Sequence, residues 1–413
     1  MTSPAARPAS SGGQVTFHAW RGRAGFTGGR HRGTTVRHGA LVLGGPVGTL
    51  DYTDPFGEGH TTTYEFATWL SPRVRTPFGL TELVSSWNAT TPAGTWLQVE
   101  VSGRTQAGVQ TTWHVLGRWA CGDSGDPAFH RACVEGRADG AGAVDTDTFA
   151  TRGGHVLADY QLRVTLFRAS GGTATPAVRL VGAVASGAAT GPDHPPVDTP
   201  EEAPPCRVAG TVLDVPRYSQ ELHRGSCVEY AGGGETWCSA ASTAMVLDYW
   251  DRGPSRLEMA WLDPAYPDPQ VAHAARSVFD YGYGGTGNWS FNVAYAGSRG
   301  LEAFVTRLGS LAEAERFIDA GIPLVVSASF AAEELDGAGY ATDGHLMVLV
   351  GFDRDGNPVV NDPASHRIAS DEEVRVTYDR AQLERAWSRS GRTVYVCHPV
   401  DAPLPDRRGG RHW

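Results

Sequence analysis

The sequence contains no lysine, since all 35 cationic side chains among its 413 residues are Arg. This absence excludes a Schiff-base lysine and the lysine of a phosphate-binding P-loop. Long apolar runs are also absent. Because no stretch of about 18 apolar residues occurs, we expect no membrane span.

Cysteine is scarce, and acidic residues outnumber basic ones. Six cysteines are too few for a disulfide scaffold, although Cys121 and Cys133 would suit a local bridge, and Cys206 and Cys397 would staple the ends of one domain. No Cys-x-x-Cys pair has a His partner, so we expect no structural zinc, and neither another metal nor a cofactor. The formal net charge of −10 argues against a general nucleic-acid binder.

The first part of the chain has the pattern of β-structure. Residues 1–13 are small and polar, and we expect a flexible N-terminus there. Within residues 14–186, runs such as Trp96–Val101 alternate apolar with polar residues, which is the period of a half-buried strand, and no convincing helix pattern occurs. These features predict an all-β sandwich of jelly-roll-like type. The expected strands are Tyr64–Leu70, Glu82–Trp87, Trp96–Val101, Thr112–Trp119 and Leu162–Arg168.

A proline-rich segment divides this block from a second one. Residues 187–205 offer little to bury and are expected to form a linker. In residues 206–400 helical patterns precede strands, which predicts an α+β domain with an antiparallel sheet, and residues 401–413 are expected to form a polar tail. The expected helices are 239–250, 269–281 and 311–320, and the expected strands are 323–330, 345–352, 358–361, 374–377 and 393–397.

Three separated positions of the second block suit nucleophilic catalysis. Cys238 directly precedes an amphipathic helix pattern, where free N–H groups and the helix dipole stabilise a thiolate. His345 opens an apolar strand and Asp362 follows the next one. An Asp-Gly turn at Asp355 joins these strands as an antiparallel hairpin, so His345 and Asp362 meet at the same end. For each residue alone, a structural role stays open.

Three further residues are candidates for a catalytic cleft. The Gln220 amide would suit the stabilisation of a developing oxyanion. Trp237 adjoins Cys238, and Trp289 lies in the Gly/aromatic loop Gly285–Asn292, which would suit an extended peptide backbone, so both are candidates for substrate binding. A surface glutamine and an ordinary surface loop stay open as alternatives.

The order Gln, Cys, His and Asp along the chain resembles that of the papain-like cysteine peptidases. Four segments carry a narrower likeness, to the family typified by the bacteriocin-leader-processing peptidases: DVPRYSQ, WCSAASTAMVLDYW, GHLMVLVGFD and VVNDPAS. The likeness is to the stand-alone actinobacterial branch and covers about residues 212–400. The use of arginine without lysine, typical of a GC-rich genome, points to the same kind of bacterial source.

The resemblance implies a papain-like cysteine peptidase domain that hydrolyses peptide bonds of a peptide or protein substrate through a thioester. It implies Cys238 as nucleophile and His345 as general base and then acid. Asp362 would orient the imidazole, and Gln220 would stabilise the oxyanion. The family also suggests a secreted protein, although Met1–Gln14 lacks the apolar core of a signal peptide, so the localisation stays open.

Two other functions stay open at this point. The same triad would serve an acyltransferase or transpeptidase, with an amine accepting the thioester in place of water. Alternatively, the N-terminal β domain carries the main role and binds a carbohydrate or a cell-surface ligand through its tryptophans, which more often belong to a core. These tryptophans are Trp69, Trp87, Trp96, Trp113 and Trp119.

Overall fold

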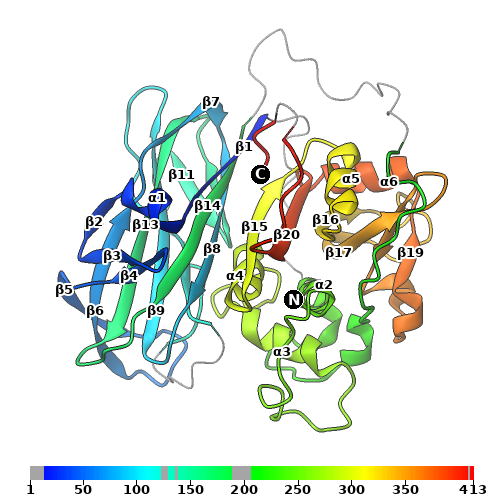
Figure 1. The fold of residues 1–413 in the computed structure, drawn as a ribbon, viewed down its shortest axis with the longest axis horizontal. Helices are drawn as coiled ribbons and strands as arrows, with labels where there is room; N and C mark the ends of the chain where they lie inside the picture. The colour runs from blue at the N-terminus through cyan, green and yellow to red at the C-terminus, as the bar shows by residue number, and fades with distance from the viewer. Residues whose placement is uncertain (1–13, 122–128, 135–137, 188–205, 408–409) are drawn as a thin grey trace.

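The computed structural model describes residues 14–121, 129–134, 138–187, 206–407 and 410–413. Figure 1 shows a strand-rich N-terminal part beside a mixed α/β C-terminal part. The expected flexible N-terminus, residues 1–13, lies outside the described residues. So does the expected linker 187–205, apart from Gly187, which ends a strand.

The N-terminal part consists mostly of two seven-stranded antiparallel sheets. One sheet has the strand order β11 (Gly142–Asp145), β12 (Thr148–Thr151), β8 (Glu82–Thr90), β14 (Ala177–Gly187), β4 (Ala40–Leu43) and β3 (Thr34–Arg37), and β1 (Gln14–Arg21) pairs with β14. The other has the order β10 (His114–Trp119), β9 (Thr95–Thr105), β13 (Leu157–Ala169), β6 (Thr61–Leu70) and β2 (Arg30–Arg32). In this second sheet β5 (Gly48–Thr53) pairs with β6, and β7 (Val74–Leu80) pairs with β13.

All five expected strands of this part are present, but β9 is buried more completely than its alternating pattern predicts. Leu97 and Val99 lie in the large core that the two sheets share. Trp96 points to the other face, where it stacks on Phe167 with ring centroids 3.7 Å apart and on Phe129 at 4.8 Å. The polar residues Thr95, Glu100 and Ser102 of β9 are buried as well, whereas Gln98 and Arg104 are half-buried.

One short helix of this part was not expected from the sequence. Helix α1 (Gly22–Thr27) has six residues, too few to show a helical period. Its Phe26 is fully buried against Trp69, and the Trp69 indole N–H donates to the Phe26 carbonyl over 2.9 Å. Tertiary packing, rather than local propensity, therefore accounts for this turn of helix.

The C-terminal part is built on one six-stranded antiparallel sheet surrounded by helices (Figure 1). Its strand order is β15 (Leu301–Arg307), β20 (Thr393–Pro399), β16 (Leu324–Phe330), β17 (Thr342–Phe352), β18 (Pro358–Asn361) and β19 (Arg375–Thr377). The α-helices are α2 (Cys238–Tyr249), α3 (Pro269–Val278), α4 (Trp289–Ser298), α5 (Leu311–Asp319) and α6 (Arg380–Ser388). Short 3-10 helices are η1 (Gln220–His223), η2 (Gly234–Thr236), η3 (Ser365–Arg367) and η4 (Asp371–Glu373).

The three expected helices and five expected strands of this part are present, while α4, β15 and α6 were missed. Every residue of α4 from Ser290 to Gly297 is buried, so no polar face alternates with an apolar one to give a helical period. Helix α6 does carry a readable start signal, because the Asp379 carboxylate caps it by accepting from the Gln382 N–H over 2.9 Å.

The two parts meet where α4 and β15 face β8 (Figure 1). The Asn88 side chain on β8 donates to the Ala303 carbonyl over 2.7 Å and accepts from the Ala303 N–H over 3.0 Å. Two residues further along each strand, the Ser86 hydroxyl accepts from the Val305 N–H over 2.8 Å. A Cβ at Gly297 would lie 2.5 Å from the Asn88 amide, so only glycine permits this approach. Side chains of β8 thus pair with the backbone along the open edge of β15.

Within the described ranges, no helix is both long and apolar enough to cross a membrane.

Candidate active site

Cys238 is the first residue of α2, at the place where the sequence predicts a helix start. No side chain caps the helix, and the Ser239 and Leu346 N–H groups both donate to the sulfur. The side chain is partly exposed. Burial alone would raise the pKa of the Cys238 thiol, but the hydrogen bond and charge of His345 and the two N–H groups bring the pKa below its ordinary value. Such a thiol is suited to nucleophilic attack.

His345 lies between this thiol and a carboxylate. It is the fourth residue of β17 rather than its first, and only 4% of it is exposed. The ring atom Nε2 lies 2.7 Å from Asp362 Oδ1, which leaves Nδ1 for the Cys238 sulfur. Burial lowers the pKa of His345, but the charge of Asp362, its hydrogen bond and the thiolate more than offset this and raise the pKa to about 10. The imidazole is therefore protonated at neutral pH.

Asp362 follows β18, which pairs with β17 in antiparallel register, as the Asp-Gly hairpin predicts. The residue is completely buried. Its Oδ1 also accepts from the Ala364 N–H over 2.9 Å, while Oδ2 accepts from the Tyr340 and Tyr378 hydroxyls, each over 2.7 Å. Burial would raise the pKa of Asp362, but His345 and these donors lower it, so the group is a carboxylate. The two tyrosines had no signal in the sequence, because they come from separate segments.

Gln220 connects the two ends of the candidate triad. Its backbone N–H donates to the carbonyl of Pro363, next to Asp362, over 2.9 Å. Its side-chain Nε2 donates to the carbonyl of Glu235, three residues before Cys238, over 2.8 Å. Sixteen residues of Gly-rich chain separate Gln220 from Trp237, but η2 folds back so that this segment returns to the glutamine. The structure thus brings Cys238, His345 and Asp362 together and bonds Gln220 to the backbone next to Asp362 and near Cys238.

Two family models match the two parts of the chain. One, described as the Peptidase C39 N-terminal domain, matches residues 16–186, and the other, described as the Peptidase C39-like family, matches residues 212–395. Both parts of the chain therefore resemble C39-like peptidases. This confirms the resemblance to an actinobacterial branch, and it supports a cysteine peptidase acting on a peptide or protein substrate.

Other comparisons with this C39-like chain are distant. No curated protein matches it. Each of three solved structures covers 43% of the chain at a TM-score of 0.15. They are the enzymatically active domain of bacteriophage CBA120 tailspike protein 4 (10% identity), a structure of promiscuous carbohydrate-binding modules from the β-sandwich superfamily (9%) and an Arthrobacter globiformis T6 isomalto-dextranase complexed with panose (12%). The chain spans 21%, 61% and 33% of those chains, respectively.

The two tryptophans expected to bind substrate occupy different environments. Trp237 has no exposed surface, and its indole N–H donates to the Tyr230 carbonyl over 2.7 Å. This burial argues against a direct contact between the ring and substrate, because no part of the ring reaches the surface. Trp289 is half-buried at the start of α4. Its loop joins the nucleophile segment, because the Thr286 hydroxyl donates to the Thr236 carbonyl over 3.0 Å.

The tryptophans of the N-terminal part are mostly core residues. Trp69, Trp87, Trp96 and Trp119 are at most 1% exposed, so their ring faces cannot stack on a sugar. Trp113 is half-buried, with the Arg163 guanidinium 4.4 Å from its ring centroid. Four of the five tryptophans are therefore core residues, as is usual for aromatic side chains between packed sheets.

Neither disulfide that the cysteine spacing left open is formed. No disulfide joins Cys121 to Cys133 or Cys206 to Cys397. The described parts of the chain also contain no group of three or more His, Cys, Asp or Glu side chains placed to hold a metal ion.

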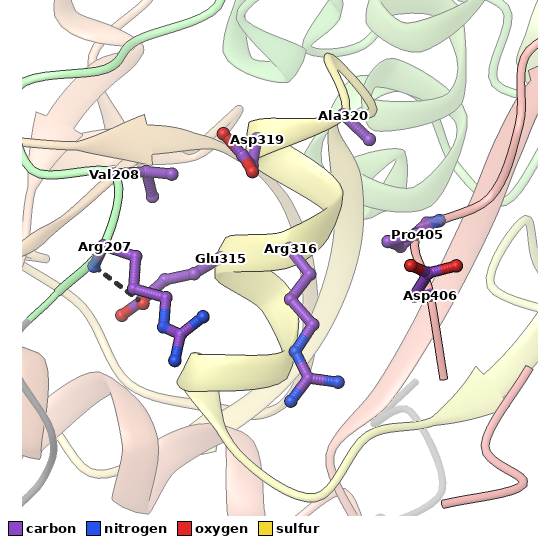
Figure 2. A pocket seen from close by; sticks show the side chains of 8 residues that line it. All are labelled: Arg207, Val208, Glu315, Arg316, Asp319, Ala320, Pro405 and Asp406. Carbon is purple, nitrogen blue, oxygen red and sulfur yellow. Dashed lines mark hydrogen bonds between the residues drawn. The ribbon is translucent and has the colours of Figure 1, made fainter. Parts of the chain in front are cut away.

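A surface pocket of about 270 Å³ lies away from these residues (Figure 2). Figure 2 shows that α5 supplies Glu315, Arg316 and Asp319 to its lining. Glu315 is already engaged by the Arg207 N–H at 3.1 Å and by Arg380 at 2.6 Å. The pocket contains none of the candidate catalytic residues and mixes both signs of charge.

Proposed function

We propose that this chain is a cysteine peptidase with the triad Cys238, His345 and Asp362. The observation that carries the proposal is the single imidazole that contacts both a thiol at a helix start and a buried carboxylate. The raised pKa of His345 and the lowered pKa of Cys238 favour a thiolate–imidazolium pair at neutral pH. This pair is the reactive form of a cysteine nucleophile.

In the proposed reaction the Cys238 thiolate attacks the scissile carbonyl and forms a tetrahedral oxyanion. The Cys238 N–H and the second N–H of the Gln220 amide stabilise the oxyanion, since the bond to the Glu235 carbonyl uses only one of the two amide hydrogens. The imidazolium of His345 then gives its proton to the leaving amine, and the C–N bond breaks. His345 next removes a proton from water, which attacks the thioester and releases the acid and the thiolate.

The proposed catalytic part occupies a papain-like domain, residues 206–400. Its support is the placement of the cysteine on α2 and of the His-Asp pair on an antiparallel sheet. We propose that residues 14–186 form a jelly-roll-like sandwich domain, supported by the two antiparallel sheets that share one core. On this division, residues 187–205 are the linker and residues 401–413 the tail.

The other thiols of the chain are internal controls for a test of the nucleophile. Cys206 and Cys227 are also partly exposed, but burial raises the pKa of each of them. Brief treatment with iodoacetamide at pH 7, followed by mass-spectrometric mapping, should modify Cys238 first. Labelling of Cys238 at the same rate as Cys206 or Cys227, or more slowly, would contradict the proposal.

Turnover is tested with a diverse peptide library. The wild type should cleave members of the library, and the Cys238→Ala variant should not, whereas Cys227→Ala should retain activity. A primary amine added during the reaction separates hydrolysis from acyl transfer. An amide product would show that the amine, rather than water, accepts the acyl group of the thioester. Equal cleavage by wild type and Cys238→Ala would refute the proposed nucleophile.

A further inference from the structure

The Asp362 carboxylate has two oxygens with separate sets of partners. Oδ1 receives His345 at 2.7 Å and the Ala364 N–H at 2.9 Å. Oδ2 receives only hydroxyl donors, from Tyr340 and Tyr378, each at 2.7 Å. An Asp with no exposed surface therefore has four donors, and half of them come from tyrosines.

The two tyrosines reach Asp362 from different segments of the chain. Tyr340 lies between β16 and β17, and Tyr378 lies between β19 and α6. They are 7% and 1% exposed, respectively, so water cannot readily replace either hydroxyl. The Tyr340 ring also contacts the His345 ring edge-on, with centroids 5.3 Å apart and planes at 74°. The Tyr340 ring also contacts the Phe330 ring, with centroids 5.3 Å apart, and the Arg367 guanidinium, 4.7 Å from its centroid.

We propose that Tyr340 and Tyr378 are positioning residues that keep Asp362 ionised and direct its Oδ1 to His345. The inference rests on the proposed peptidase function. A carboxylate without solvent needs donors on both oxygens, or it takes up a proton. By occupying Oδ2, the hydroxyls also prevent the carboxylate from rotating away from the imidazole. The edge contact of Tyr340 restricts the ring of His345 itself.

Loss of one of these hydroxyls should raise the pH at which the Cys238 thiolate forms. The charged and titratable groups around Asp362 are His345, with Cys238 behind it, the two tyrosines, and Arg367 above Tyr340. With one donor removed, Oδ2 is no longer held in place, Oδ1 is free to rotate away from Nε2, and the imidazolium of His345 becomes less stable. The Cys238 thiolate then forms only at higher pH. The midpoint of thiolate formation should therefore move to higher pH in each variant that lacks a hydroxyl.

The experiment measures the rate of Cys238 alkylation by iodoacetamide as a function of pH. The variants are Tyr340→Phe, Tyr378→Phe and the double variant, each of which keeps its ring. The matched control is Tyr295→Phe, because Tyr295 is 1% exposed and its hydroxyl bonds to His273 at 2.9 Å, apart from the triad. The midpoint of the acid limb should shift upward in the first three variants and stay at the wild-type value in the control.

A second measurement separates positioning from a general loss of stability. In an Asp362→Asn background the carboxylate is gone, so adding Tyr340→Phe should shift the midpoint no further. A full additional shift in that background, or wild-type midpoints in both single variants, overturns the inference. In that case rapid labelling of wild-type Cys238 would still leave the proposed function standing. If wild-type Cys238 is not labelled preferentially, the proposed function itself fails.

Discussion

Replacement of Asn88 by alanine should loosen the contact between the two parts of the chain. Asn88 is 1% exposed, and its amide satisfies both the carbonyl and the N–H of Ala303 on β15. Alanine would leave these two buried backbone groups without partners. Since an unpaired buried group costs about 1–3 kcal/mol, we expect the free energy of unfolding to fall by about 3 kcal/mol. This loss is a substantial fraction of the free energy of unfolding of an ordinary domain, which is about 5–15 kcal/mol.

The assay is urea denaturation of the full chain, followed by tryptophan fluorescence. With a slope of about 3 kcal/mol per molar urea, the midpoint should fall by about 1 M. The control is Gln98→Ala, which also removes an amide from the N-terminal part but only a half-buried bond from Arg118 at 3.0 Å. A midpoint shift for Asn88→Ala no larger than that of Gln98→Ala would refute the reasoning.

Three further changes test other contacts. Gly297→Ala should destabilise the chain by about 1–3 kcal/mol, because its Cβ would lie 2.5 Å from the Asn88 amide; a wild-type urea midpoint would contradict this. Burial and the charge of a neighbouring acid raise the pKa of Asp147 to about 6. The folded chain thus keeps a proton on Asp147 that the unfolded chain loses, so the contribution of this residue to stability should fall between pH 3.8 and about 6. The melting temperature of Asp147→Asn relative to wild type should therefore rise over that range, and a constant difference would contradict this. His345→Ala should slow alkylation of Cys238 at pH 7 by about tenfold or more, since only the Ser239 and Leu346 N–H groups then oppose the rise in the thiol pKa that burial causes; an unchanged rate would argue against the pair.

The sequence was sufficient to predict the parts of the site that depend on local pattern. A cysteine before a helix pattern and an Asp-Gly turn between two apolar strands are short-range features. They predicted the α2 start and the β17–β18 hairpin that brings His345 to Asp362. Their spacing depends on a few neighbouring residues, which local rules describe well.

The missed features depend on distant parts of the chain. Helix α4 is buried on every side because β8 and β15 cover it, and no local pattern records that burial. Tyr340 and Tyr378 meet Asp362 only after three loops fold together. Trp237 adjoins the nucleophile in sequence, yet its ring faces inward, since adjacency does not fix the direction of a side chain.

The pairing of β8 side chains with β15 has a consequence for handling the protein. Strand β15 bonds to β20 on one side only, and the amide of Asn88 and the hydroxyl of Ser86 occupy the backbone of its other side. If the C-terminal part were expressed alone, this uncovered strand would offer donors and acceptors to any second copy, which is a common route to aggregation. In the full chain, the N-terminal part therefore shields this strand from pairing with a second copy.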